Sequence, residues 1–338
     1  MDTAQAPQQP LPVPPSHRRS VSPTAGPRVW FTTLTAGWVA GYLLVRLVLA
    51  AIDVPVPLSA IGPDLIVLAD PAAAGTLVLG LLTVGAQAGV LRRAGSARLR
   101  ILVTVISAGT AVALMAASAL VILDLVGGLL PGLGVPFFAW GALSRLGCAI
   151  AAVLIGRHAW LFWRATGPDD GARPGVQQTP AWAIAAGYVT VAVCLTRLTA
   201  QLVVGMEMNP LGGGAAQVVF EAGFLLAGLL LPLALVHRWG RILPGWIPWL
   251  GGRRVPRQLL LTCGSVLGVT MAAYFGTMTV MMVLDRLAGR NPFPSSPGMD
   301  LPEAFFWVSV PAYLVWGIGL VIGTLSYARV TAPARRER

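Results

Sequence analysis

The sequence predicts an all-α membrane protein with eight transmembrane helices, arranged as two tandem four-helix units in a parallel repeat. Three observations predict this class: the composition, the length of the apolar runs and the placement of the arginines. Of the 338 residues, 56% are hydrophobic and only 11% are charged, whereas soluble domains carry about 25% charged residues. The mean hydropathy of +0.73 leaves too few polar groups to cover a water-facing surface. Lipid is therefore the expected solvent for most of the chain.

Apolar runs in this chain are long enough to cross a bilayer, which takes about 20 residues per helix. The runs span residues 30–52, 71–91, 101–123, 137–162, 181–204, 214–236, 258–284 and 304–327. Backbone groups in lipid must be hydrogen-bonded within the protein, so the runs are expected to be helices. Proline and glycine gather in the gaps between them, as expected of turns.

The basic residues predict the orientation. All 24 are arginine, and they cluster in every second connection. One set of connections, with the C-terminal tail, holds Arg92, Arg93, Arg98, Arg100, Arg164, Arg173, Arg238, Arg241, Arg253, Arg254, Arg257, Arg329, Arg335, Arg336 and Arg338. The opposite connections hold only Arg286 and Arg290 among their basic residues, together with the acids Asp53, Asp64, Asp70, Glu207, Asp300 and Glu303. The positive-inside rule then places both termini in the cytoplasm.

The net charge of +11 is therefore a topology signal, and we expect no nucleic-acid partner. Arginine without lysine in an alanine- and glycine-rich chain is typical of a GC-rich bacterial genome. The expected location is the bacterial cell membrane, with the lipid bilayer as the main partner.

The chain divides into segments by composition. The boundaries are a disordered cytoplasmic tail at 1–29, a first four-helix unit at 30–162, a cytoplasmic linker at 163–180, a second four-helix unit at 181–327 and a basic cytoplasmic tail at 328–338. The first tail is rich in proline and has little apolar surface to bury, which predicts disorder.

Short matches recur in the same order in the two units. Ala74–Leu82 resembles Ala222–Leu230, Ala36-Gly37-Trp38 resembles Ala186-Gly187-Tyr188, the segment from Asp124 resembles that from Asp285, and Phe137-Phe138 matches Phe305-Phe306. Four spans per unit is an even number, so both units enter the membrane from the same side. The repeat axis would then follow the membrane normal. Chance similarity among helices rich in alanine, glycine and leucine is the alternative.

Ionisable residues within the apolar runs are the candidate site. They are Arg46, Arg145, Arg197 and Glu221, with Asp124 and Asp285 at the outer ends of the third and seventh runs. At a rise of 1.5 Å per residue, the first four lie roughly 9–12 Å below the outer boundary. One interpretation is a shared polar site for an anion, because the arginine fork pairs with carboxylate or phosphate. The other is that these groups pair among themselves or reach the outer headgroups.

The connection at 237–257 combines tryptophan with arginine, as is typical of a membrane interface. Its candidate residues are Trp239, Arg241, Trp246, Trp249, Arg253 and Arg254. We interpret it as an interfacial segment that contacts anionic lipid headgroups; a docking site for a protein partner, whose nature is unknown, is the alternative. Arg157 and His158, near the inner end of the fourth run, are expected to extend to the cytoplasmic interface.

Signals of catalysis, metal binding or cofactor binding do not appear in the sequence. Cys148, Cys194 and Cys263 lie within apolar runs, where small packing residues are expected. The histidines lack the spacing of a zinc site. Residues 212–214 form a glycine run without the lysine of a phosphate loop, and there is no G-x-S-x-G motif. We expect no catalytic residue, metal or cofactor. Glycine pairs of the GxxxG type, at Gly37/Gly41, Gly85/Gly89, Gly264/Gly268 and Gly319/Gly323, permit close helix approach.

Two segments carry a resemblance. The stretch W-G-R-I-L-P-G-W-I-P-W-L-G-G-R-R-V-P from Trp239 to Pro256, and the ending from Gly317 to Arg329 with Leu325-Ser326-Tyr327, are similar to segments of uncharacterised actinobacterial multi-spanning membrane proteins. Together they cover about a tenth of the chain. The resemblance implies a similar topology and brings no substrate, reaction or catalytic residue.

Three functions fit these features. The first is a small-solute permease, or the membrane subunit of one, for an anionic or zwitterionic solute. The second is a non-catalytic structural or accessory membrane protein that binds a partner through the loop at 237–257. An intramembrane enzyme comes third, because no nucleophile–base pair stands out in the sequence.

Overall fold

The computed structural model describes residues 29–52, 70–93, 96–135, 137–166, 178–205, 214–245, 251–293 and 301–332. Its elements are α1 (Val29–Ala51), α2 (Asp70–Arg93), α3 (Ala97–Ala117), α4 (Val121–Leu129), η1 (Pro131–Leu133), α5 (Ala139–Thr166), α6 (Ala181–Val204), α7 (Ala215–Leu225), η3 (Leu226–Leu230), α8 (Leu231–Val236), η4 (Arg238–Gly240), α9 (Arg257–Leu287) and α10 (Glu303–Val330). Eight helical segments are long and apolar enough to cross a membrane, the sixth being the continuous run α7–η3–α8. The all-helical class and the eight apolar spans are confirmed. The predicted disordered tail lies outside the described residues, apart from Val29.

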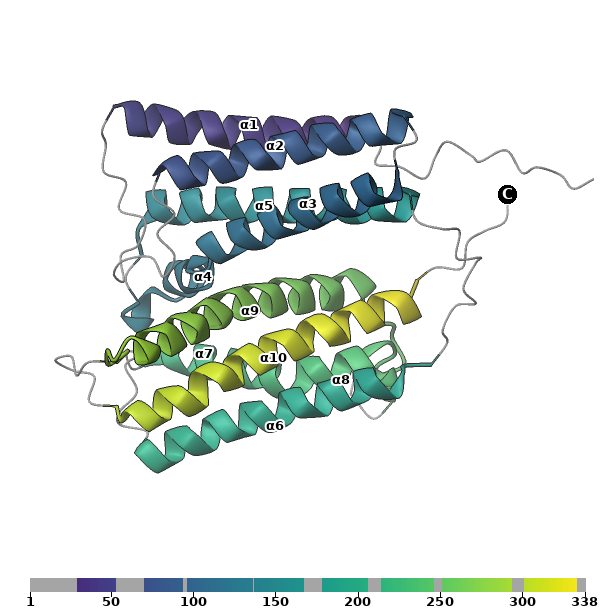
Figure 1. Ribbon diagram of the computed structural model, residues 1–338. Coiled ribbons are helices and arrows are strands. Elements are labelled where there is room, and N and C mark those ends of the chain that lie inside the picture. The colour runs from purple at the N-terminus through teal and green to yellow at the C-terminus, as the bar shows by residue number, and fades with distance from the viewer. Residues whose placement is uncertain are drawn as a thin grey trace, which may run out of the picture.

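The spans form two bundles, which lie one above the other in Figure 1. The first bundle contains α1, α2, α3 and α5; the second contains α6, α7–η3–α8, α9 and α10. In both bundles the first span packs on the second, the second on the third, and the fourth on the other three. The two cores include Val39, Leu77, Leu114 and Ile155 in the first bundle, and Cys194, Leu235, Trp316 and Leu320 in the second. The two halves of the chain thus share one packing scheme.

Contacts between the bundles join α3 with α9, α4 with α9, and η1 with α7. We call the end at which α1 begins and α10 ends the terminal end, and the opposite end the far end. In Figure 1, α4 lies at the far end on the side of the first bundle that faces α9, and α7 lies at the same end within the second bundle. A Cβ atom added to Gly132 in η1 would lie 2.9 Å from the Cβ of Ala216 in α7, so glycine allows this close approach.

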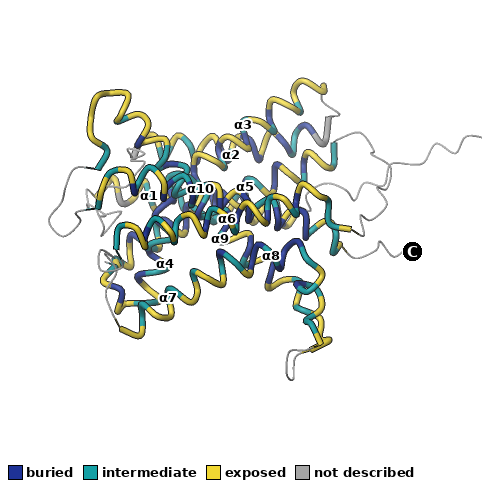
Figure 2. Tube along the Cα trace, turned by 90° about the horizontal axis from the view of Figure 1, so that it is seen from below, coloured by how far each residue is buried: buried dark blue, intermediate teal, exposed yellow. Residues whose placement is uncertain are grey.

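Apolar side chains cover much of the outer surface of the protein. Figure 2 shows buried segments toward the middle of the bundles and exposed ones along the outward sides of the helices. Leu44, Leu82, Val112 and Trp140 are among the exposed large side chains. In water such a surface would drive association, whereas in a bilayer it is the surface that lipid covers. This distribution fits an integral membrane protein.

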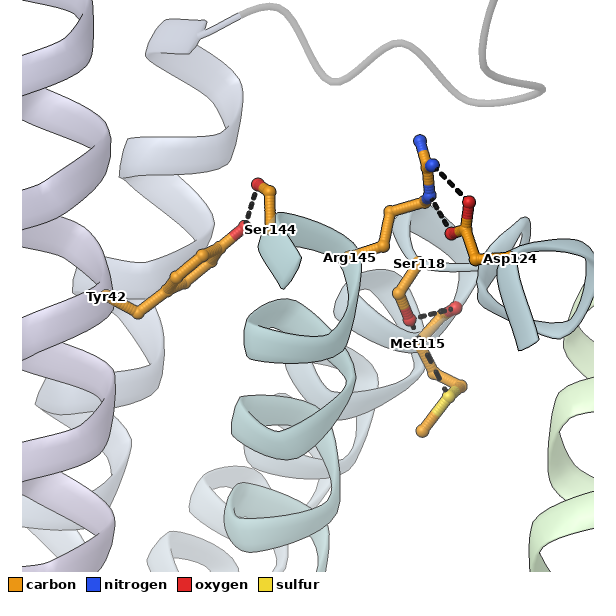
Figure 3. A network of polar contacts seen from close by, with 6 residues as sticks. All are labelled: Tyr42, Met115, Ser118, Asp124, Ser144 and Arg145. Carbon is orange, nitrogen blue, oxygen red and sulfur yellow. Dashed lines mark hydrogen bonds and ion pairs between the residues drawn. The ribbon is translucent and has the colours of Figure 1, made fainter. Parts of the chain in front are cut away.

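The third predicted span is interrupted. The sequence predicts one helix over 101–123, but α3 ends at Ala117, and a turn at 118–120 separates it from α4. In this turn the Ser118 hydroxyl donates to the carbonyl oxygen of Met115 at 2.9 Å and contacts its sulfur at 3.8 Å (Figure 3). A serine that bonds to nearby backbone groups competes with the helical pattern. Asp124 therefore lies in the separate helix α4, which reaches toward α9.

The sixth span contains a π-helical segment, η3, which the apolar run did not predict. Pro232 follows in the first turn of α8 and has no N–H with which to bond the carbonyl of Gly228. Loss of one such hydrogen bond lets the helix widen locally, and π-segments occur often at functional sites. A Cβ on Gly228 would collide with the sulfur of Cys194 and lie 2.9 Å from the Trp316 ring. The widened segment therefore packs tightly against α6 and α10.

The GxxxG pairs differ between the halves. Around Gly37, Gly41, Gly85 and Gly89 an added Cβ would meet nothing within 4 Å. In the second half, Gly264 approaches the Thr324 hydroxyl, Gly268 approaches Val321, and Gly319 approaches the Thr190 hydroxyl. Among the glycines of these pairs, close packing therefore occurs where α9 and α6 meet α10.

Candidate functional site

Arg145 and Asp124 form a buried ion pair at the far end of the first bundle. Arg145 Nε donates to Asp124 Oδ2 at 2.5 Å, and its Nη2 donates to Oδ1 at 2.6 Å. The two side chains are 3% and 8% exposed. Figure 3 shows the two-pronged arrangement, in which α5 supplies the arginine and α4 the aspartate. Such a fork neutralises both charges and ties the displaced helix α4 back to its own bundle.

Arg46 lies near the same end of this bundle, on α1. It is half-buried and acts electrostatically on Tyr42 and Cys148. The Tyr42 hydroxyl lies 3.2 Å from that of Ser144, the residue before Arg145, and this hydrogen bond joins α1 to α5 (Figure 3). The two predicted arginines of the first half are thus close to one polar seam between α1 and α5.

Arg197 has a different environment on α6 of the second bundle. Its guanidinium carbon lies 5.0 Å from the ring centre of Phe305 and 5.5 Å from that of Tyr313, both on α10. Its Nε is buried without a hydrogen-bond partner. Among the ion pairs of the described chain none joins Arg197 to a carboxylate. Aromatic faces and a hydrogen bond with the Tyr313 side chain therefore compensate the charge of Arg197, whereas Asp124 compensates that of Arg145.

An aromatic cluster continues from Arg197 into the core. Tyr313 stacks on Phe275 at 4.3 Å and on Trp316 at 5.9 Å, while Phe224 meets Trp316 edge-on at 4.9 Å. Phe224 lies on α7, just before the π-segment. The cluster thus draws α7, α9 and α10 together, and Tyr313 joins it to Arg197 on α6.

Polar atoms without partners accompany the cluster. Ser309 lies between Phe305 and Tyr313 on the same face of α10, since each is four residues from it. Ser309 is 3% exposed, Trp316 is 2% exposed, and neither the Ser309 Oγ nor the Trp316 Nε1 has a hydrogen-bond partner. Threonines elsewhere in the spans, such as Thr35 and Thr190, bond to the carbonyl four residues before them. The Ser309 hydroxyl does not, and it shares this lack of a partner with the buried hydroxyls of Ser107, Thr324 and Ser326.

Glu221 and Asp285 complete the predicted set. Glu221 accepts a hydrogen bond from Gln217 Nε2 at 2.7 Å, one turn earlier on α7. Asp285 accepts from Arg290 at 2.5 Å in a pair that is open to solvent. Arg286 pairs with Glu303, which also accepts from Trp307.

Of the predicted site residues, the structure brings Arg145 and Asp124 into direct contact, and it places Arg197 and Glu221 in the other bundle.

Searches among protein families, curated proteins and solved structures found no match. Function must therefore be argued from the site itself.

A second polar network at the terminal end was missed. His158 is fully buried, so the prediction that its side chain extends to the cytoplasmic interface is wrong. Its Nδ1 lies 2.5 Å from Gln87 Oε1, and its Nε2 lies 3.1 Å from the Thr32 hydroxyl. Arg157 is exposed and lies over the Phe31 ring at 5.5 Å. The spacing of residues along the helices does not predict this network, because Thr32, Gln87 and His158 lie far apart in the sequence.

In the loop at 237–257, the described segments 241–245 and 251–255 pair in the manner of a short hairpin. Backbone hydrogen bonds of 2.9–3.0 Å join Leu243 with Arg253 and Gly252, and an isolated bridge joins Ile242 with Arg254. Arg241 donates to the Thr179 hydroxyl at 2.9 Å. Exposed Arg253 and Arg254 contrast with half-buried Trp239 and Arg241, and Trp239 packs on the second core. The predicted interfacial residues Trp246 and Trp249 lie outside the described residues.

Within the described ranges, no cluster of histidine, cysteine, aspartate or glutamate has the composition to hold a metal ion. The described cysteines are free thiols, and Cys148 donates to the Leu114 carbonyl at 3.2 Å.

Proposed function

We propose that this protein is a small-solute permease, or the membrane subunit of one, and that its substrate is anionic or zwitterionic. The observation that carries the proposal is Arg197, a cation in a membrane span with aromatic walls and no described carboxylate partner. A charged residue within a transmembrane segment marks a functional site by default.

Magnitudes favour a ligand at Arg197. On insertion scales, the free-energy cost of an arginine at a helix centre is about 2.5–3.5 kcal/mol. A desolvated cation–π contact offsets about 2 kcal/mol of this cost, while the unpartnered Nε adds a penalty of about 1–3 kcal/mol. An anion that accepts from the guanidinium would remove both deficits. At Arg145 the fork to Asp124 has already done so.

The orientation and location are part of this proposal. We infer that the terminal end faces the cytoplasm of a bacterial cell, because exposed Arg98, Arg164, Arg254 and Arg329 lie there. Asp124, Asp285 and Glu303 lie toward the far end. Arg197 would then sit in the outer half of the cell membrane.

We further propose that the two bundles arose by tandem duplication, with boundaries at 30–162 and 181–327. The shared packing scheme supports this. If Phe138 corresponds to Phe306, then Arg145 corresponds to Tyr313, because both are seven residues further along. The position that holds a neutralised arginine in one half thus holds an Arg197-contacting tyrosine in the other. A new anion-binding site requires an arginine whose charge is not already neutralised by a carboxylate of the protein, as that of Arg145 is by Asp124.

Uptake into proteoliposomes tests the permease. We expect purified protein to accelerate the entry of at least one small organic anion, and Arg197→Gln to abolish that acceleration. Arg290→Gln is the matched control, since it removes an arginine from an exposed pair. If no anion is taken up faster than by protein-free vesicles, the proposal is wrong.

A second candidate is an accessory protein that binds a partner through 237–257, with anionic lipid headgroups as a further contact. The hairpin supports it, because backbone bonds hold exposed Arg253 and Arg254 in place. Replacing both arginines with glutamine should then abolish co-purification of a partner protein while leaving anion uptake unchanged. A partner that is retained by this double variant excludes the hairpin as the docking site.

A further inference from the structure

We propose that the Arg197 site selects organic carboxylates that carry no positive group, and that it rejects zwitterions. The inference rests on the proposed function and narrows its substrate class. It follows from the donors at the site, the state of the acidic side chains and the apolar walls.

The hydrogen-bonding groups at the site are mostly donors. The Arg197 guanidinium can only donate, and the Ser309 hydroxyl can donate or accept. The Arg197 Nε and the Ser309 Oγ have no partners among the described residues, while the Tyr313 side chain hydrogen-bonds with the guanidinium. A ligand must therefore present acceptors and negative charge, as a carboxylate does.

A zwitterion would also need an acceptor for its ammonium group. Each described acid whose side-chain placement is known already has a partner. Asp124 is held by Arg145, Glu221 by Gln217, Asp285 by Arg290, and Glu303 by Arg286 and Trp307. To bury an ammonium beside Arg197 without a carboxylate would place two like charges together in an apolar environment, which is costly. The site thus discriminates through repulsion as well as attraction.

The walls favour an apolar body behind the carboxylate. Phe305 and Tyr313 flank the guanidinium, and Phe224 and Trp316 extend the cluster toward the π-segment. Apolar and aromatic surfaces in contact with these rings would gain free energy from burial, whereas inorganic phosphate would gain none. An aromatic or branched aliphatic monocarboxylate therefore fits better than a bare oxyanion.

Binding to the full-length protein in detergent tests the inference with benzoate, phenylalanine, benzylamine and inorganic phosphate. Calorimetry should detect benzoate, with the other three at least about tenfold weaker. Ser309→Ala should weaken benzoate about tenfold, the usual effect of one hydrogen bond to a charged group. Arg197→Lys should weaken it further, because lysine lacks the planar fork. Arg290→Gln should leave it unchanged.

The outcomes separate the inference from the proposed function. Binding of phenylalanine as tight as that of benzoate, with both lost in Arg197→Lys, overturns the exclusion of zwitterions and leaves the permease standing. Tight phosphate binding overturns the organic class. Benzoate binding that survives both Arg197→Lys and Ser309→Ala, or no benzoate binding at all, overturns the site. The permease itself falls only if the uptake assay fails for every anion.

Discussion

Two arginines at comparable depth have opposite surroundings in this molecule. Arg145 meets a carboxylate through two hydrogen bonds, whereas Arg197 meets two aromatic rings. In the first arrangement both charges are paired, whereas in the second the Arg197 Nε has no hydrogen-bond partner. Depth along the helix alone therefore does not tell how the charge of a membrane arginine is compensated. The neighbouring side chains do.

The Asp124–Arg145 pair predicts a non-additive response to mutation. Asp124→Ala should lower the free energy of unfolding by about 3–5 kcal/mol, because it leaves a buried guanidinium without its anion. The double variant Asp124→Leu/Arg145→Met should lie close to the wild type, since a buried pair can be replaced by apolar groups at little cost. Reversible unfolding in mixed micelles measures both.

Asp285→Ala is the control, because its pair with Arg290 is exposed and should contribute at most about 1 kcal/mol. Losses that simply add in the double variant would show that the two residues act independently.

The glycines of the GxxxG pairs are packed closely in the second bundle but not in the first. Gly264, Gly268 and Gly319 face side chains of neighbouring helices at distances that exclude a methyl group, whereas Gly37 and Gly41 face open space. The same motif thus has different roles in the two halves, because only the surroundings decide whether a glycine is needed.

Gly319→Ala and Gly41→Ala should therefore have opposite effects. The first forces a methyl group against Thr190, which is fully buried, and should cost about 1–3 kcal/mol. The second should be neutral or raise stability by up to about 1 kcal/mol, as alanine favours helix. Melting temperatures in detergent compare them. Equal shifts in the same direction would contradict the packing of α6 on α10.

At the scale of the whole molecule, the arginine bias predicts where the termini lie. A fluorescent reporter at the C-terminus should fold, since it would remain in the cytoplasm. Alkaline phosphatase inserted in the connection 286–302 should be active, because that connection would be outside. Phosphatase activity from a C-terminal fusion would rule out the proposed orientation.

The packing scheme also predicts that the halves can be made separately. A chain cut within the linker 163–180 and expressed as two fragments should reassemble, because most helix contacts lie within a bundle. Affinity purification of one fragment should recover the other. Recovery should weaken in Gly132→Leu, which crowds the contact of η1 with α7, and should be unaffected by Gly85→Leu, which faces open space. Fragments that never associate would contradict this.

Much of the architecture could be predicted from the sequence, because the bilayer sets both the length and the polarity of a spanning helix. The break at Ser118 and the π-segment before Pro232 could not, since serine, glycine and proline are tolerated in many transmembrane helices. Counting residues along each helix places Arg145 and Arg197 at similar depths, but it does not tell which side of the helix each residue faces. Their partners, Asp124 in one case and Phe305 with Tyr313 in the other, are set by how helices pack.

The central position of α10 has a consequence for biosynthesis. In its most apolar stretch 44% of the residues are buried, the largest share of the eight spans, and it packs on every other span of its bundle. It is also the last of these spans to leave the ribosome. The second half must therefore wait in the membrane with Trp316 and its neighbours missing, while the first half can already be closed. A premature stop codon after α9 would leave three helices without the one that holds them together, and we expect such a product to be degraded by membrane proteases.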